Sequence, residues 1–134
     1  MSASQSTGTF QGWPGNRRAA ISLSFDDSVL SQLDNAFPVL ERWGVRATFY
    51  VLPGEGSAFE AHIDRWRAVH ASGHELGNHT LSHPCSRRHP FTPPGRALEE
   101  WNLERIEADI DAADRRLEEL VPGLGPRSFA YPCG

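Results

Sequence analysis

The sequence has no long apolar run and no surplus of positive charge. None of its 134 residues lie in a stretch that approaches the roughly 20 apolar residues needed to cross a membrane. Thirteen basic against seventeen acidic side chains give a net charge of −4, so no basic stripe is available to neutralise phosphates. We therefore expect neither a membrane span nor a nucleic-acid partner.

Cysteine is scarce, and a secretion signal is not visible. The residues that follow Met1 show neither a cationic start nor an apolar stretch, so they do not resemble a leader peptide. Nothing in the spacing of Cys85 and Cys133 demands that they pair, and we expect two free thiols in a reducing compartment. These absences favour a cytoplasmic protein, while secretion stays open if the chain is incomplete.

Internal repeats and phosphate-binding glycine patterns are also missing, which argues against a solenoid and against a nucleotide-binding loop after the first predicted strand. Residues 1–18 are rich in Ser, Thr, Gly and Asn without periodicity, and we interpret them as a disordered lead-in. Residues 19–134 then form one domain.

What the chain does contain is an alternation of strand and helix patterns. Apolar, β-branched and aromatic runs predict four strands, at residues 19–25, 47–52, 74–76 and 128–131. Apolar residues three and four apart predict three helices, at residues 30–40, 59–69 and 103–120. Pro38 should kink the first helix or mark the start of its regular part. This order predicts an α/β fold with a parallel sheet, either a barrel or an open doubly wound sheet.

Polar residues follow three of the predicted strands. Asp26 and Asp27 come after the first strand, His79 and His83 after the third, and residues 132–134 after the fourth. In parallel sheets the chemistry gathers at the carboxyl ends of the strands. We therefore expect these three clusters to converge on one rim.

The two histidines are the strongest sign of a metal site. His79 and His83 are four apart, a spacing that places both imidazoles on one face of a helical turn, where they can bind one ion. Thr80 stands where the metalloprotease pattern of the same spacing has its glutamate, so a base must come from elsewhere. The alternative is that two surface histidines are four apart by chance. For the aspartate pair, the alternative is a helix N-cap formed by Asp27 or Ser28.

Four segments, taken in order, resemble the first three motifs of the NodB-homology polysaccharide deacetylases, carbohydrate esterase family 4: SLSFDDS, ATFYV, GHELGNHTLSHP and SFAYPCG. The resemblance runs from about residue 21 to residue 134. It implies a distorted (β/α) barrel, here partial with about four parallel strands. It also implies metal-dependent removal of acetyl groups from an N-acetylated or O-acetylated polysaccharide.

The resemblance also implies roles for individual residues. They are Asp26 as catalytic base, the backbone amide of Cys133 as oxyanion donor, Asp27, His79 and His83 as metal ligands, and Tyr131 and Pro132 as walls of the substrate groove. Two imidazoles and a carboxylate suit a divalent metal, for which we expect zinc, with cobalt, nickel and manganese as further candidates.

The chain also departs from the family pattern. Ala130 stands where the third motif usually has an arginine, and Ser28 replaces the glycine of the first motif. The later motifs, which line the groove and supply a leaving-group histidine, have no counterpart up to Gly134, so we expect a domain truncated at its C-terminus, with weak metal binding and poor turnover. Two alternatives stay open: an incomplete fragment that binds metal or glycan without turnover, and a hydrolase of small amides or ureides.

Overall fold

The computed structural model describes residues 12–133. Residues 1–11, the larger part of the predicted disordered lead-in, lie outside the described residues, and so does Gly134. Within the remainder of that lead-in, a short 3-10 turn, η1, spans Pro14–Asn16. No helix between residues 12 and 133 combines the length and the apolar character that a bilayer crossing requires.

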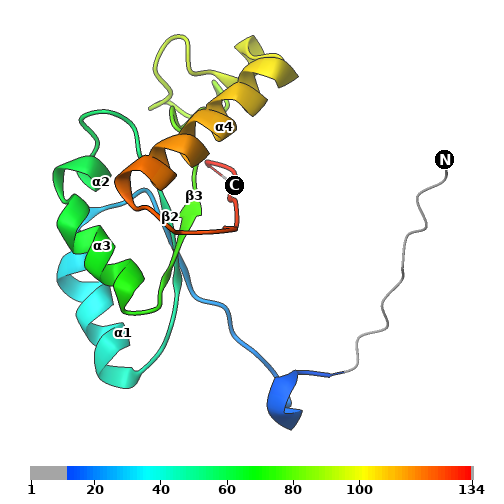
Figure 1. Cartoon of the computed structure of the whole chain (residues 1–134). Coiled ribbons are helices and arrows are strands. Elements are labelled where there is room, and N and C mark those ends of the chain that lie inside the picture. The colour runs from blue at the N-terminus through cyan, green and yellow to red at the C-terminus, as the bar shows by residue number, and fades with distance from the viewer. Residues whose placement is uncertain (1–11, 134) are drawn as a thin grey trace, which may run out of the picture.

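A parallel sheet lies at the centre of the molecule (Figure 1). Its strands are β1 (Ser24–Asp26), β2 (Thr48–Val51) and β3 (Glu75–Asn78), in the order β1-β2-β3. The register places Phe25 opposite Phe49, and Phe49 opposite Leu76. The α/β class with parallel strands, predicted from the alternating patterns, is confirmed.

In the structure, the first and fourth strands are shorter than the apolar runs that predicted them. Pairing on β1 begins at Ser24, five residues after the start of the predicted strand. Of the predicted fourth strand, only Phe129 forms a parallel bridge, to Asn78 of β3. Pro132 has no N–H to donate, and Cys133 has a φ of 62°, so the chain turns away before a ladder can extend.

The helical elements are η2 (Gln32–Ala36, a π-helical stretch), α1 (Phe37–Trp43), α2 (Ala58–Ala61), α3 (Ile63–Ala71), η3 (Leu98–Glu100) and α4 (Leu103–Leu120). Pro38 lies in the first turn of α1 and marks the start of the regular helix. The helix predicted at residues 59–69 is divided at His62. Only α4 has both predicted ends, and its first turn is capped by Asn102, whose side chain accepts from the amide of Arg105 at 2.9 Å.

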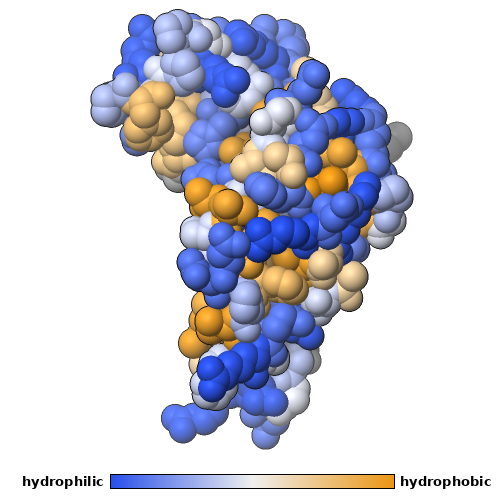
Figure 2. Space-filling model, turned by 90° about the vertical axis from the view of Figure 1, so that its left-hand side faces the viewer, coloured by the Kyte–Doolittle hydropathy of each residue, from blue (hydrophilic) through white to orange (hydrophobic). Residues whose placement is uncertain are grey.

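Most of the apolar core lies between the sheet and the helices α1, α2 and α3, which Figure 1 shows together on one side of the strands, and Leu117 of α4 and Val121 complete it. Alternate residues of β2, Phe49 and Val51, are fully buried. The Phe49 ring stacks on Phe25 at 5.1 Å and meets Trp66 of α3 edge-on at 5.6 Å. On the outer face shown in Figure 2, apolar residues reach the surface in separate patches between hydrophilic ones.

The edge of the sheet at β3 receives the end of the chain, through the parallel bridge between Asn78 and Phe129. Gly77 of β3 leaves room for the ring of Tyr50, because a Cβ at Gly77 would lie 2.6 Å from that ring. The Tyr50 hydroxyl in turn lies 3.1 Å from the Ser128 hydroxyl. The Ser128 carbonyl accepts from the amide of Asn78 at 2.9 Å. These contacts hold residues 128–130 beside β3, at the rim where β1 and β3 end.

Candidate active site

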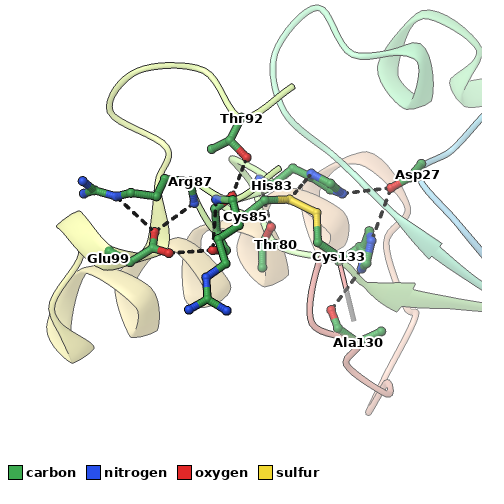
Figure 3. Close-up of a disulfide and its surroundings, with 12 residues drawn as sticks. Asp27, Thr80, His83, Cys85, Arg87, Thr92, Glu99, Ala130 and Cys133 are labelled. Carbon is green, nitrogen blue, oxygen red and sulfur yellow. Dashed lines mark hydrogen bonds and ion pairs between the residues drawn. A yellow bond between two sulfur atoms is a disulfide. The ribbon is translucent and has the colours of Figure 1, made fainter. Parts of the chain in front are cut away.

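Asp27, His79 and His83 meet at the carboxyl ends of β1 and β3. Figure 3 shows Asp27 facing His83. Oδ1 of Asp27 lies 3.0 Å from Nε2 of His83 and 3.3 Å from Nε2 of His79. Ligand atoms held at about 2.1 Å around a tetrahedral ion are about 3.4 Å apart. The structure therefore brings together the aspartate and the histidine pair that the sequence places after different strands, at a spacing that fits one divalent ion.

The turn after β1 directs Asp27 toward the histidines. Asp27 and Ser28 both have left-handed backbones, with φ values of 76° and 55°. The hydroxyl of Ser28, which is buried, accepts a hydrogen bond from the amide of Leu52 at 2.9 Å. Ser28 thus ties the loop after β1 to the loop after β2, and neither residue serves as the helix cap considered as the alternative.

The segment that carries both histidines is a loop, and the helical turn predicted for it is wrong. Thr80 and His83 have φ values of 70° and 52°, which no right-handed helix allows. The side chain of Asn78 accepts from the amide of Thr80 at 2.8 Å, and the hydroxyl of Thr80 accepts from the amide of His83 at 3.0 Å. Side-chain oxygens close this turn in place of the backbone bonds of a helix.

Asp109 of α4 holds the same loop from outside. Its carboxylate accepts from the amides of Leu81 and Ser82 at 3.0 and 3.1 Å, and from the hydroxyl of Ser82 at 2.5 Å. It therefore fixes the two residues between Thr80 and His83. Sequence reasoning missed Asp109, because α4 carries several acidic residues and nothing in their order marks this one.

The surroundings of His79 fix the position of its proton. Its ring is buried, and Nδ1 lies 3.0 Å from the carbonyl oxygen of Ala130. A carbonyl only accepts, so Nδ1 carries a proton, and in the neutral ring Nε2 presents its lone pair to the carboxylate of Asp27. Two electron-rich atoms facing each other are stabilised by a cation between them. When a histidine binds a metal through one ring nitrogen, the other nitrogen commonly donates to a carbonyl, as Nδ1 of His79 does here.

Exposure differs across the three candidate ligands. The side chain of His79 is 2% exposed, that of His83 25% and that of Asp27 54%. The group is therefore buried on the His79 side and open to solvent on the Asp27 side. An ion held there would have room for water and substrate, as a catalytic site requires.

Cys85 and Cys133 form a disulfide, with their Cα atoms 5.9 Å apart, so the expectation of two free thiols is wrong (Figure 3). Their separation of 48 positions in the sequence conceals their proximity. The bridge between Asn78 and Phe129 returns the end of the chain to β3, next to the loop that carries Cys85. The reducing compartment inferred from free thiols loses its basis.

The remaining predicted residues lie at the same rim. Asp26 ends β1 and is exposed, and its backbone carbonyl accepts from the side-chain amide of Gln32. Tyr131 is 68% exposed, whereas Pro132 is buried. Both line a cavity of about 320 Å³ together with Cys133. Among residues 12–133 the backbone N–H of Cys133 has no acceptor.

The sequence pattern of the polysaccharide deacetylases matches residues 15–134. The chain belongs to the polysaccharide deacetylase family. The resemblance to the NodB-homology deacetylases, stated from four short motifs, is confirmed. A chitin deacetylase from Colletotrichum lindemuthianum is 33% identical over 66 residues, which cover 48% of this chain and 27% of that protein.

Solved deacetylase structures share the fold. The deacetylase PplD from Streptococcus pyogenes matches with a TM-score of 0.67 at 20% identity, over 88% of this chain and 48% of that one. The peptidoglycan N-acetylglucosamine deacetylase Bc1960 matches with a TM-score of 0.57 at 26% identity, over 75% of this chain and 41% of that one. The predicted partial barrel of the deacetylase type is confirmed. The chain spans 4% to 27% of the length of the related proteins that it matches in sequence.

One departure of this chain from the family motifs has a structural counterpart. Ala130 replaces the usual arginine, and its carbonyl is the group that orients His79. Arg127 does not take over the arginine's place near the aspartates, because its guanidinium pairs with Asp114 and Glu118 of α4 at 3.1 and 3.3 Å. The carboxylate of Asp26 therefore has no arginine partner among the described residues.

His74 lies close to the candidate ligands in sequence but has a structural role. Its Nδ1 accepts from the amide of Ala47 at 3.2 Å, so its Nε2 carries the proton and donates to Glu41 at 3.1 Å. This hydrogen bond from His74 lowers the pKa of Glu41. His74 therefore links α1 to the start of β2 and is not available to a metal.

Proposed function

We propose that this chain is the part of a metal-dependent deacetylase that holds the metal and the catalytic base, and that it acts on an N-acetylated glycan. The observation that carries the proposal is the convergence of Asp27, His79 and His83, in which the outer nitrogen of His79 already donates to a carbonyl. Family membership supplies the reaction class, and the donor set of two imidazoles and one carboxylate suits zinc.

The chemistry divides between the ion and the chain. When bound, a divalent ion polarises the acetyl carbonyl and makes a water more acidic, which an unreactive amide requires near neutral pH. The carboxylate of Asp26, on the exposed end of β1, accepts the proton of the attacking water. The water oxygen bonds to the acetyl carbon, the leaving nitrogen takes up the proton that Asp26 accepted, the carbon–nitrogen bond breaks, and acetate and the amino sugar are released.

The end of the chain would stabilise the charge that develops on the acetyl oxygen. The amide of Cys133 has no acceptor among residues 12–133, so it is free to donate to an oxygen that becomes negative. The left-handed φ of 62° at Cys133, together with the disulfide to Cys85, fixes the direction of this donor. Tyr131 and Pro132 form the wall beside it, where a sugar ring would lie.

Metal binding tests the ligand set independently of turnover. In zinc titrations followed by calorimetry, with the disulfide intact, His79→Ala and Asp27→Ala should each weaken binding by about tenfold or more. His62→Ala, which removes a histidine outside the group, is the matched control and should leave the affinity unchanged. Equal affinity for the wild type and for His79→Ala would exclude His79 as a ligand.

Turnover tests the base. Release of acetate from an acetylated chitooligosaccharide, followed by mass spectrometry, should be abolished by Asp26→Asn while zinc binding stays intact. Zinc binding by the wild type without any release of acetate would favour a fragment that binds metal without catalysis. Hydrolysis of a small ureide but not of the oligosaccharide would instead favour a small-amide hydrolase.

A further inference from the structure

The disulfide joins two segments that both carry residues of the site (Figure 3). Cys85 follows His83 by two residues, and Cys133 ends the segment that contains Tyr131. Sγ of Cys85 lies 3.5 Å from Nδ1 of His83, while Nε2 of the same ring faces Asp27 at 3.0 Å. The sulfur atoms therefore lie behind the imidazole, on the side opposite the carboxylate.

Backbone contacts, besides the bond between the sulfur atoms, hold the two cysteines in place. The amide of Cys85, which is buried, donates to the carbonyl of Arg96 at 3.2 Å. The segment that leads to Cys133 is fixed to β3, where the amide of Ala130 donates to the carbonyl of Asn78 at 3.1 Å. Because these backbone contacts do not involve the sulfur atoms, we expect reduction to leave the two thiols next to each other and next to the His83 ring.

We propose that reduction of the Cys85–Cys133 disulfide opens a second metal site, formed by both thiolates and Nδ1 of His83. Ligand atoms from the three residues all lie within 4.8 Å of one another. With zinc–sulfur bonds of about 2.3 Å and zinc–nitrogen bonds of about 2.0 Å, a tetrahedral site places nitrogen and sulfur about 3.5 Å apart and the two sulfurs about 3.8 Å apart. Two thiolates and one imidazole select a zinc-like cation over magnesium or calcium, and the fourth position is left to water.

Reduction of the disulfide and binding of the cation are two separate reactions, and atoms and charge balance in each. A phosphine reductant takes up the oxygen of one water and becomes a phosphine oxide, while the sulfur–sulfur bond receives two electrons and two protons and becomes two thiols. Each thiol then releases its proton to solvent as it binds the cation. The oxidised form cannot build this site, because a disulfide sulfur carries no negative charge.

Both sites use His83, so one imidazole couples them. A neutral imidazole has one lone pair, and it binds a metal through one nitrogen while the other carries the proton. In the thiolate site Nδ1 binds the ion, and the proton on Nε2 is donated to Asp27, which already lies 3.0 Å away. An ion in the thiolate site therefore removes a ligand from the proposed catalytic site. This competition rests on the proposed function, whereas the thiolate site itself does not.

Cobalt(II) distinguishes the two sites, because cobalt bound to thiolate absorbs in the near ultraviolet by charge transfer from sulfur, and cobalt bound only to nitrogen and oxygen does not. We expect this band when cobalt is added to the phosphine-reduced chain and not to the oxidised chain. In the reduced chain, Cys133→Ser and His83→Ala should each weaken the cobalt affinity by about tenfold or more, and Asp27→Ala should leave the band intact. In the oxidised chain, Asp27→Ala should weaken cobalt binding.

Three results would overturn parts of this proposal. A reduced chain that binds cobalt without the charge-transfer band, while its circular dichroism is unchanged, would exclude the thiolate site. A band that survives His83→Ala would exclude the shared ligand. Cobalt binding to the oxidised chain that is insensitive to Asp27→Ala would refute the proposed catalytic site and the competition, and leave the thiolate site standing.

Alkylation of the thiols provides a second measurement that holds even if reduction loosens residues 128–133. After removal of the phosphine, zinc should slow the reaction of Cys85 and Cys133 with iodoacetamide by about tenfold, because a metal-bound thiolate is a poor nucleophile. His83→Ala should abolish this protection, and His62→Ala should preserve it. Equal alkylation rates with and without zinc would refute the thiolate site.

Discussion

The sheet with α1, α2 and α3 is filled with apolar side chains, whereas the segments 79–102 and 121–133, here called the site loops, are held by polar contacts and one disulfide. Phe49, Trp66 and Val69 in the first region have no exposed surface. In the second, side-chain oxygens of Asn78 and Asp109 satisfy the loop amides. Apolar burial is non-directional and tolerates small shifts, while hydrogen bonds fix directions. The stable region and the region that positions ligands are therefore built from different interactions.

The largest loss of stability should come from the apolar region. Trp66→Ala removes a fully buried ring that contacts Phe49 and Phe59, and it should lower the free energy of unfolding by about 3–5 kcal/mol. Denaturant titration followed by circular dichroism measures it. The matched control is Trp43→Ala, which removes a 73% exposed ring and should stay within about 0.5 kcal/mol of the wild type. Equal losses would contradict the division into two regions.

The disulfide should be the largest single contribution within the site loops. The double variant Cys85→Ser with Cys133→Ser frees a closed loop of 48 residues and should lower the free energy of unfolding by about 2–4 kcal/mol. Reduction of the wild type should produce a loss of similar size. If both changes left the denaturation midpoint where it was, the site loops would not depend on this cross-link.

Most of the apolar region could be predicted from the sequence. Apolar residues three and four apart from Leu103 to Leu120 predict α4, whose buried Leu117 joins the core. The β-branched and aromatic content of residues 47–52 predicts β2. The sequences of the site loops show no regular spacing of apolar residues, so no such pattern predicts their structure. The two histidines were found from their spacing, but the turn that carries them depends on the side chains of Asn78 and Thr80.

The interactions that sequence reasoning missed are long-range pairings between single residues. The disulfide joins residues 48 apart, and the contacts of Asp109 with residues 81 and 82 span 27 or 28 positions. No local pattern encodes such a partner. The predicted convergence of strand ends succeeded because it follows from parallel topology alone, which is set by the order of strands and helices.

Asp109 should affect the metal site more than it affects the fold. Asp109→Ala leaves the amides of Leu81 and Ser82 without their acceptor, so the loop between His79 and His83 loses its fixed shape. We expect zinc affinity to fall by about tenfold, equivalent to about 1.4 kcal/mol. The control is Asp111→Ala, the same charge change at an exposed position of α4. An equal fall in both variants would indicate a general effect of charge rather than loss of the loop contacts.

Glu99 should give the smallest effect, confined to acid pH. The hydroxyl of Ser86 and the amide of Arg87 donate to its carboxylate at 2.6 and 3.0 Å, and they lower its pKa from 4.5 to about 2. Because the folded pKa is depressed, this stabilisation is present above pH 4.5, declines as the pH falls below that value, and is lost as the pH passes through about 2. The NMR shift of the Arg87 amide should therefore titrate with a midpoint near pH 2.

Two variants test the assignment of this titration to Glu99. Glu99→Gln should abolish it, and Glu100→Gln, which changes a neighbouring partner of the Arg87 guanidinium, should retain it. A midpoint near 4.5 would show that these hydrogen bonds do not hold this part of the site loops.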